Sequence, residues 1–334
     1  MTAPTTAANY TARHAAADAV SVVRLNDTAR GVTVAVAPAI GNIAYEILVN
    51  QKNIVWFPYQ RPSEAAGSPH LCAVPFLAPW ANRLDDDAYW ANGRRYLLNS
   101  SLGNLRRDGN LKPIHGLLAF SSAWELREAS ADEHSAWATS RLEFWKHPGL
   151  MAQFPFAHVI TMTHRLSNGV VQVETTIENL SSDPMPVSVG FHPFFRLHDS
   201  PRDQWKVHIA AREQLLLNDL LIPTGQRKPL EFSDPHPLER GAIDNVFTNL
   251  TPSSDGLAHF WVQGERERIT VTYGAKYPVA VIYAPPGREF ICFEPMSAIT
   301  DAFNLAHAGL YNELQSIPPG AKWSESFWIS AEGF

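Results

Sequence analysis

The stretch Val171-Gln172-Val173-Glu174-Thr175-Thr176-Ile177-Glu178 alternates apolar or β-branched residues with polar ones along its whole length. A period of two residues places one set of side chains on a core face and the other on a wet face, which is typical of a half-buried strand in an antiparallel sheet. The same alternation recurs in residues 32–36, 269–273 and 279–283. The sequence therefore predicts a protein built mostly of antiparallel strands.

Turn-forming residues separate these alternating segments. The 334-residue chain contains 25 prolines and 19 glycines, and clusters such as Ser167-Asn168-Gly169 and Pro285-Pro286-Gly287 lie between the predicted strands. We find no long amphipathic helix and no alternation of strands with helices. Many short strands at regular spacing predict an all-β fold, either a large antiparallel sandwich or a barrel.

The chain is predicted to have two parts. Residues 1–19 are rich in Ala and Thr and are expected to be an N-terminal leader, either disordered or a short helix. They contain Arg13 and His14 and lack the continuous apolar run of a signal peptide. Residues 20–334 show no linker and no internal repeat, so we expect them to form a single domain with a sizeable core.

Composition and charge argue against several kinds of partner. The formal net charge is −6 and Lys and Arg form no block, so we expect no nucleic-acid partner. Every apolar stretch is broken well short of a membrane span, so we expect no membrane partner. Cys72 and Cys292 make no CxxC pair and no disulfide framework, which favours two reduced core thiols in a cytoplasmic protein. The oligomeric state is not predicted.

Motifs for common cofactors and nucleophiles are missing from the sequence. There is no GxGxxG opening a helix, no P-loop, no HExxH and no GxSxG. We therefore expect neither a metal nor a cofactor, and the candidates for catalysis are His and carboxylate side chains in unusual local contexts.

His192 lies in the aromatic segment Gly190-Phe191-His192-Pro193-Phe194-Phe195. One interpretation is a core histidine with one nitrogen satisfied. The other is a proton donor that lines a pocket, since the unperturbed pKa of imidazole lies near neutrality. Because a residue before proline is pushed into extended geometry, Pro193 would fix how His192 presents its ring.

Glu294 ends the apolar segment Phe290-Ile291-Cys292-Phe293-Glu294 and is followed by Pro295. A glutamate there either reaches solvent at the strand end or is buried and used, because an unpartnered buried carboxylate is costly. Burial beside aromatic rings would raise its pKa toward the range that suits a general base.

Two further segments carry a His and an Arg. His115 precedes Gly116, and this pair allows a tight turn or a close backbone approach, although a turn histidine would look the same. Asn82 and Arg83 could hydrogen-bond sugar hydroxyls. The alternative is a loop arginine paired with one of the three aspartates at positions 85–87.

Asp244 stands in the segment Ile243-Asp244-Asn245-Val246-Phe247, where a helix cap or an Asx turn is the default interpretation. It is the weakest of the candidates when taken alone.

Together, and in this order, the motifs resemble the aldose 1-epimerase (galactose mutarotase-like) family over about Gly31 to Ser330. The resemblance implies a large antiparallel β-sandwich with an open cleft on one sheet. Matching segments that carry it are Asn82-Arg83, His115-Gly116, Gly190–Phe195, Ile243–Phe247 and Cys292-Phe293-Glu294-Pro295. The departure is at residues 85–89, where the family often has a glycine and this chain has Asp85-Asp86-Asp87-Ala88-Tyr89.

The resemblance also implies roles for the matching residues. Glu294 matches the general base, His192 the general acid and His115 a second active-site histidine. Arg83 and Asp244 match positions that hold sugar hydroxyls. The implied reaction interconverts the α and β anomers of a free aldose by acid–base ring opening and reclosure, with Glu294 starting ionised and His192 protonated.

Three alternatives to this function stay open. The protein could be a sugar-binding module of the same fold without catalysis. It could be a glycoside hydrolase that uses Glu294 and Asp244 as its two carboxylates. It could also be a mutarotase for a phosphorylated or acidic sugar, in which case the cleft rim needs cations; the candidates are Arg94, Arg95, Arg106, Arg107 and Lys112.

Overall fold

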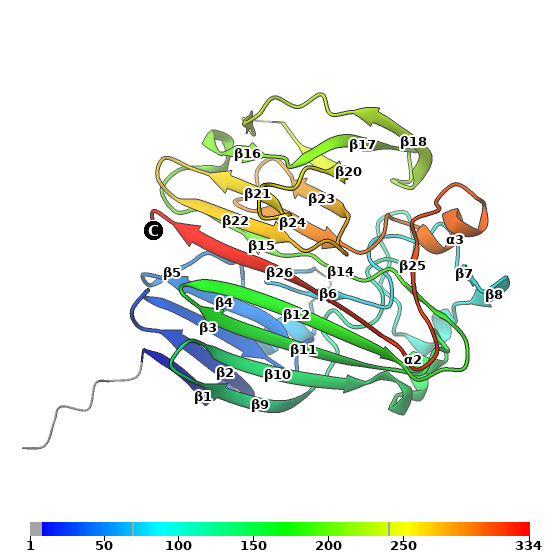
Figure 1. The fold of residues 1–334 in the computed structure, drawn as a ribbon, viewed down its shortest axis with the longest axis horizontal. Helices are drawn as coiled ribbons and strands as arrows, with labels where there is room; N and C mark the ends of the chain where they lie inside the picture. The colour runs from blue at the N-terminus through cyan, green and yellow to red at the C-terminus, as the bar shows by residue number, and fades with distance from the viewer. Residues whose placement is uncertain (1–8, 69, 240) are drawn as a thin grey trace, which may run out of the picture.

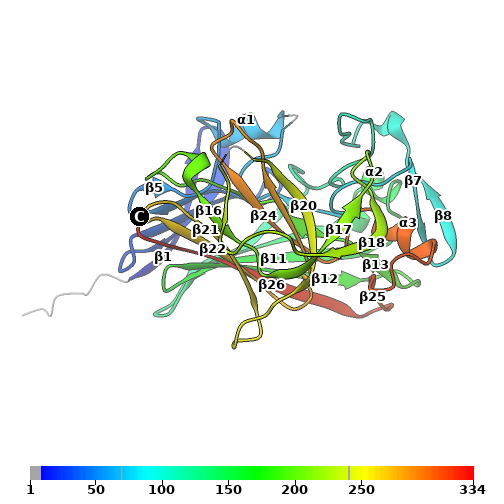
Figure 2. The ribbon, with the colours of Figure 1, turned by 90° about the horizontal axis from the view of Figure 1, so that it is seen from above.

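Antiparallel strands dominate the computed structural model, which describes residues 9–68, 70–239 and 241–334 (Figures 1 and 2). Three larger sheets form the body of the molecule. The five-stranded sheet follows chain order and consists of β1 (Tyr10–Ala17), β2 (Val20–Asp27), β3 (Val32–Ala37), β4 (Ile43–Val49) and β5 (Lys52–Asn53). The nine-stranded sheet has the order β19 (His236–Pro237), β16 (Lys206–His208), β21 (Ala258–Gln263), β22 (Arg268–Tyr273), β26 (Lys322–Glu332), β12 (Val170–Asn179), β11 (His158–Ser167), β10 (Ala136–Glu143) and β9 (Glu125–Ala131).

The eight-stranded sheet carries the candidate site. Its order is β18 (Pro223–Pro229), β17 (Ala211–Leu217), β20 (Ile243–Leu250), β23 (Val279–Ala284), β24 (Ile291–Met296), β14 (Gly190–Phe191) and β6 (Phe76–Leu77), with β15 (Phe194–Phe195) also paired to β24. Two further sheets have two strands each: the hairpin of β7 (Ala88–Ala91) with β8 (Arg94–Leu97), and the long-range pair of β13 (Met185–Val187) with β25 (Gln315–Ile317).

Helices in the described residues are few and short. They are α1 (Pro62–Ala66), α2 (Pro148–Met151), α3 (Ala302–His307) and the 3-10 turns η1 (Ser100–Leu102), η2 (Phe144–Lys146) and η3 (Arg202–Gln204). Within the same residues, no helix has the length and apolar character needed to span a membrane. The all-β prediction is therefore confirmed.

The alternation that predicted the fold is present in β12. Val171, Val173, Thr175 and Ile177 are buried, and the residues between them are at least partly exposed. Val171 lies opposite Ile329 of β26, and Ile329 also lies opposite Val271 of β22. The C-terminal strand β26 therefore joins the two halves of the nine-stranded sheet.

The half-buried pattern expected for residues 279–283 is wrong. On β23, Val279, Ala280, Val281 and Ile282 are all buried. Ala280 and Ile282 belong to the main core, whereas Val279 and Val281 pack in a separate apolar cluster. The side of the strand that the sequence marks as wet, with Ala280 and Ile282, thus lies in the main core, so the alternation does not mark a wet face.

The N-terminal prediction is wrong for part of its range. Residues 10–17 form β1, which pairs along its whole length with β2, rather than a helix or a disordered leader. Ala12, Ala15 and Ala17 of β1 pack against the main core, and Tyr10 is buried. Residues 1–8 lie outside the described residues, and the division into a leader and a single domain stays a prediction.

The sheets stack face to face. The five-stranded sheet packs on the part of the nine-stranded sheet formed by β9, β10 and β11 (Figure 1). One face of the eight-stranded sheet packs on the rest, where Phe191 of β14 meets Phe327 of β26 with ring centroids 4.7 Å apart. Phe293 of β24 faces the same way, toward Phe260 of β21. Because successive side chains of a strand point to opposite faces, Glu294 projects from the other face of that sheet.

Candidate active site

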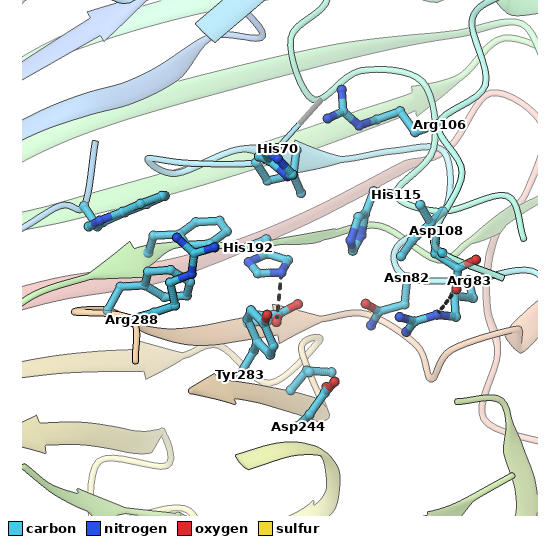
Figure 3. A pocket seen from close by; sticks show the side chains of 18 of the residues that line it. His70, Asn82, Arg83, Arg106, Asp108, His115, His192, Asp244, Tyr283 and Arg288 are labelled. Atoms are coloured by element: carbon cyan, nitrogen blue, oxygen red, sulfur yellow. Dashed lines mark hydrogen bonds and ion pairs between the residues drawn. The ribbon is translucent and has the colours of Figure 1, made fainter. Parts of the chain in front are cut away.

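A cleft of about 890 Å³ opens on this outer face of the eight-stranded sheet (Figure 3). All six residues singled out from the sequence line it: Asn82, Arg83, His115, His192, Asp244 and Glu294. They come from five separate stretches of chain, so the fold brings together side chains that the sequence keeps far apart.

His192 and Glu294 form a buried pair at the floor of the cleft. The Nε2 atom of His192 lies 3.3 Å from Oε1 of Glu294, and the two residues are 8% and 1% exposed. The ring of Phe194 stacks on the imidazole of His192 at 4.6 Å between centroids. Within the described residues, Nδ1 of His192 and Oε2 of Glu294 are buried and lack a hydrogen-bond partner. The pair thus keeps one acceptor and one ring nitrogen unused, as a site that awaits a polar ligand would.

Burial decides where the proton of this pair rests. Desolvation and, to a smaller extent, the charge of Arg83 lower the pKa of His192 to about 3. Desolvation also raises the pKa of Glu294 well above its ordinary value, and the charge of Asp244 acts in the same direction. Both shifts favour the neutral forms of the two groups, with the proton on Glu294, whereas the expectation from the sequence was an ionised Glu294 and a protonated His192.

His115 stands next to this pair on a strained turn. Its backbone is left-handed, with φ of 62°, and its ring lies edge-on to that of His192 at 5.4 Å. Gly116 follows with φ of 61°, and a Cβ there would come within 2.2 Å of the carbonyl oxygen of Ala78. Burial, and then the neighbouring His192, lowers the pKa of the His115 ring. The predicted close backbone approach at His115-Gly116 is therefore present, and it places a neutral imidazole beside the pair.

Arg83 is held by a partner that the sequence did not suggest. Its Nε donates a 2.7 Å hydrogen bond to Oδ2 of Asp108, rather than to any of the three aspartates that follow it. Asp86 and Asp87 bind Arg95 and Arg107 instead. The alternative of pairing with positions 85–87 is therefore wrong.

The backbone around Arg83 is fixed from both sides. Asn82 has a left-handed φ of 55°, and its carbonyl accepts from the N–H of His115. The carbonyl of Arg83 accepts from the N–H of Asp301. Asn82 and Arg83 are thus presented to the cleft by a loop that is tied to His115 and to the segment before α3.

Asp244 is part of a regular strand rather than of a loop, a turn or a helix cap. It lies on β20 opposite Tyr283 of β23, and its side chain is open to the cleft. Burial among its neighbours raises the pKa of Asp244, and the positive charge of Arg83 partly opposes the shift. Asp244 and Arg83 therefore bring a hydrogen-bond acceptor and a donor to the cleft that contains the His192–Glu294 pair.

Several cleft residues were missed in the sequence. Trp56, Phe194 and Phe290 form an aromatic wall, with Trp56 and Phe290 4.7 Å apart between ring centroids. Tyr283 and Arg288 line the cleft from β23 and from the turn that follows it. For Tyr283 and Arg288 the sequence carried a signal, because the Pro285-Pro286-Gly287 turn beside them joins the preceding strand to the strand that carries Glu294.

Metal ligands are not grouped in the part of the chain that the structure describes, where no set of three or more His, Cys, Asp or Glu side chains could hold an ion. Cys72 and Cys292 are free and buried.

Fold and site together define a class: a large antiparallel β-sandwich whose open cleft holds a paired carboxylate and imidazole with polar groups around them. The chain belongs to the aldose 1-epimerase family, whose model matches residues 24–330. This confirms the resemblance found in the motifs.

Two solved structures share the fold, and an uncharacterised relative matches much of the chain. The uncharacterised protein YihR of Escherichia coli is 22% identical over 241 residues, which cover 70% of this chain and 72% of YihR. A galactose mutarotase-like protein from Clostridium acetobutylicum superimposes with a TM-score of 0.85 at 20% identity and covers 98% of this chain and 99% of its own. A galactose 1-epimerase from Lactobacillus acidophilus gives 0.74 at 14% identity, with 97% and 99% covered.

Proposed function

We propose that the protein is an isomerase that interconverts the α and β anomers of a free aldose. The observation that carries the proposal is the 3.3 Å contact between His192 and Glu294 on the floor of an open cleft. Binding a sugar requires hydrogen bonds and apolar contacts but no buried acid–base pair. A buried carboxyl group with one oxygen left without a hydrogen-bond partner is costly, which favours catalysis over a binding module as its explanation.

The reaction needs only proton transfers. Glu294 removes the proton of the anomeric hydroxyl while His192 protonates the ring oxygen. The C1–O5 bond breaks to give the open aldehyde, and rotation about C1–C2 presents the other carbonyl face. The O5 hydroxyl then attacks C1, His192 recovers the proton of that hydroxyl, and Glu294 returns a proton to the oxygen on C1. Each positioned acid or base typically contributes about 10²–10⁴-fold.

One proton serves the pair throughout this cycle. The pKa shifts favour the neutral pair with the proton on Glu294, and the ion pair with the proton on His192 differs from it only by transfer across the 3.3 Å contact. A bound sugar donates a hydroxyl to the carboxylate and offers its ring oxygen to the imidazole. Both hydrogen bonds favour the charged forms, so substrate binding moves the pair toward the state that reacts.

The neighbouring side chains orient the sugar. Asp244 accepts from ring hydroxyls, and the Arg83 guanidinium, anchored by Asp108, donates to them. His115, held neutral by burial, donates to the ring oxygen or an adjacent hydroxyl and stabilises the charge that develops there. We further propose a cytoplasmic location, supported by the two buried free thiols.

Anomer exchange tests the proposal. NMR would follow freshly dissolved α-D-glucose and α-D-galactose with catalytic amounts of wild type, Glu294→Gln and, as a matched control, the exposed strand residue Glu128→Gln. Wild type and the control should accelerate exchange, and Glu294→Gln should lose about 10²–10⁴-fold while it still unfolds cooperatively. Exchange at the wild-type rate in Glu294→Gln would exclude Glu294 as the base. Binding of sugar without any acceleration would favour the binding-module alternative.

A further inference from the structure

Arg83 reaches the cleft from a loop, so its position depends on what holds that loop. Its Nε atom is fixed on Asp108, as Figure 3 shows. The positive charge of Arg83 acts on the pKa of four groups in the cleft, namely His115, His192, Asp244 and Glu294. A displacement of the loop would therefore change both the hydrogen bonds that Arg83 can donate and the electrostatics of the site.

Asp301 bonds to this loop twice. It is 1% exposed and lies directly before α3, seven residues after Glu294 in the chain. Its backbone N–H donates to the carbonyl of Arg83 at 3.0 Å, and its Oδ1 accepts from the N–H of Asp85 at 3.2 Å. One residue thus holds both peptide groups that flank Leu84, and it belongs to the same stretch of chain as the proposed base.

The carboxyl group of Asp301 is not used to cap its own helix. An aspartate directly before a helix usually accepts from a backbone N–H of the first helical turn. Asp301 stands at this position of α3 but makes no such bond with its side chain, and its backbone is left-handed, with φ of 58°. Its Oδ1 instead bonds to a loop 216 positions earlier in the chain. Helix formation therefore does not explain this side chain, whereas the loop that carries Arg83 does.

Asn304 of α3 braces the same carboxyl group. Its Nδ2 lies 2.8 Å from Oδ1 of Asp301, 2.9 Å from Oδ1 of Asp85 and 3.3 Å from the carbonyl oxygen of Ala88. The Oδ2 atom of Asp301 is buried and lacks a hydrogen-bond partner in the described residues. Burial, and then the charge of Asp85, raises the pKa of Asp301 to about 7. Below that pH one oxygen accepts and the group is neutral, an arrangement that an asparagine reproduces.

The other side of the loop is tied to the second histidine. The N–H of Leu84 donates to the carbonyl of Pro113 at 2.9 Å, and the N–H of His115 donates to the carbonyl of Asn82, also at 2.9 Å. The loop is thus held between the His115 turn and the chain segment that continues from β24. Asp301 supplies the bonds on the side of β24, so it sets where Arg83 stands relative to Glu294.

We propose that Asp301 is a positioning residue, which holds the loop of residues 82–85 so that the Arg83 guanidinium faces a sugar seated on the His192–Glu294 pair. Asp301 is not among the described residues that line the cleft, so it acts through Arg83 rather than on the sugar. The inference rests on the proposed function, because that function assigns Arg83 to the sugar hydroxyls.

Initial rates of anomer exchange with α-D-glucose and α-D-galactose test the role at pH 6, below the pKa of Asp301. Asp301→Ala removes the acceptor for the Asp85 N–H, and Asp301→Asn keeps it. Asp301→Ala should raise KM about tenfold, as for a weakened charge-assisted hydrogen bond, and change kcat less than about threefold, because Arg83 binds hydroxyls in the ground and transition states alike. Asp301→Asn should stay within about twofold of wild type in both constants.

A double-mutant cycle shows whether Asp301 acts through Arg83. Arg83→Gln removes the guanidinium and should raise KM at least about tenfold. In that background Asp301→Ala should change KM less than about twofold, because no guanidinium is left to position. Effects that multiply would show that Asp301 acts on binding by another route, and would overturn the proposal.

Asp27→Ala is the matched control. Asp27 is also 1% exposed, and its Oδ2 accepts a long-range bond at 2.9 Å from the backbone N–H of Gly169, away from the cleft. It should lower the urea midpoint of unfolding and leave KM and kcat within about twofold of wild type. Asn304→Ala, which removes the brace and keeps Asp301, is the second variant at the site and should raise KM about threefold even if Asp301→Ala does not fold.

Hydrogen exchange of peptides that span residues 82–87 reads the loop itself, without activity. The Asp85 amide should exchange at least about tenfold faster in Asp301→Ala than in wild type, and at the wild-type rate in Asp301→Asn and Asp27→Ala, because only the first variant removes its acceptor. Unchanged exchange in Asp301→Ala would overturn the proposal.

Each kinetic outcome has a defined meaning. Unchanged KM in the folded Asp301→Ala protein, unchanged KM in Asn304→Ala where Asp301→Ala does not fold, or equal increases in Asp301→Ala and either Asp301→Asn or Asp27→Ala, overturn the positioning role and leave the proposed function intact. If wild type accelerates neither sugar, the proposed function fails, and calorimetric titration with galactose then decides the role of Asp301. A Kd raised about tenfold in Asp301→Ala supports it, and equal or undetectable binding in both proteins overturns it.

Discussion

Gly190 packs β14, which leads to His192, closely against β24, which carries Glu294, so we expect its replacement by Ala to disturb both the fold and the pair. Gly190 lies on β14 opposite Met296 of β24. A Cβ at this position would lie 2.1 Å from Sδ of Met296 and 2.9 Å from the carbonyl oxygen of Pro295. Because non-bonded heavy atoms prefer about 3.5–4.0 Å, the sulfur must move by roughly 1.5 Å or the strands must separate.

Separation would act directly on catalysis. Pro295 directly follows Glu294 in the chain, and His192 lies two residues after Gly190. Separating the two strands therefore lengthens the distance between His192 and Glu294. We expect Gly190→Ala to destabilise the fold by about 1–3 kcal/mol, the usual cost of overpacking a core. A displacement of about 1 Å at the pair should also lower kcat/KM by about 10²-fold.

Urea unfolding and anomer exchange measure the two effects, and a double-mutant cycle with Met296→Ala assigns their cause. That second variant should cost about 2–5 kcal/mol alone, since Met296 is fully buried. Combined, the two should cost at least about 1 kcal/mol less than their sum, because removing the sulfur relieves the clash. Gly67→Ala, where a Cβ meets nothing within 4 Å, should stay within about 0.5 kcal/mol of wild type. Additive costs, or a Gly190→Ala protein as stable and active as wild type, would refute this account.

Two predictions concern pH. Because burial lowers the pKa of His192 to about 3 and raises that of Glu294, the pair keeps its single proton across neutral pH, so kcat/KM should stay flat from pH 7 down to pH 5. A decline centred near pH 6.5 in the rate profile would instead indicate an imidazole of ordinary pKa. Asp301 is 1% exposed, and burial raises its pKa from 3.8 to about 7. Between these two pH values the unfolded chain releases a proton that the folded chain retains. The free energy of unfolding of wild type should therefore fall by up to about 4 kcal/mol as the pH rises through this window. Asp301→Asn keeps the oxygen that accepts from Asn304 and cannot ionise. In urea unfolding, its free energy of unfolding relative to that of wild type should therefore be higher at pH 8 than at pH 4. An equal change in the free energy of unfolding with pH in both proteins would contradict the assignment.

Local pattern predicted the parts of the fold that depend on local geometry. The period-two alternation of residues 171–178 identifies β12 because a strand places alternate side chains on opposite faces whatever lies around it. The alternation does not report what covers each face of a strand. For this reason the pattern of β23 suggested a solvent-exposed face, which is buried in the structure. The expected helix or disorder was wrong for residues 10–17. Their Ala and Thr content is a weak indicator of secondary structure, and pairing with β2 outweighs it.

The motifs predicted residues that line one cleft in the structure, but they did not predict how these residues pair or which residues form the rim. His192 and Glu294 were recognisable because a histidine among phenylalanines and a glutamate at the end of an apolar segment are both unusual. Arg83 bonds to a residue 25 positions away instead of the aspartates next to it, since a left-handed turn at Asn82 directs the chain. Arg288 is an ordinary turn arginine in the sequence, and only the tertiary structure places it on the cleft.

The position of β26 has a consequence for how the protein is made. Residues 322–332 lie between β22 and β12, strands that precede them in the chain by tens of residues or more. Until these residues leave the ribosome, β22 and β12 each present an unpaired edge that could pair with the wrong strand of this chain or of another. Completion of the sandwich beneath the cleft must therefore follow synthesis of nearly all the residues described here, and nascent chains that stall before residue 322 would be the species most in need of a chaperone.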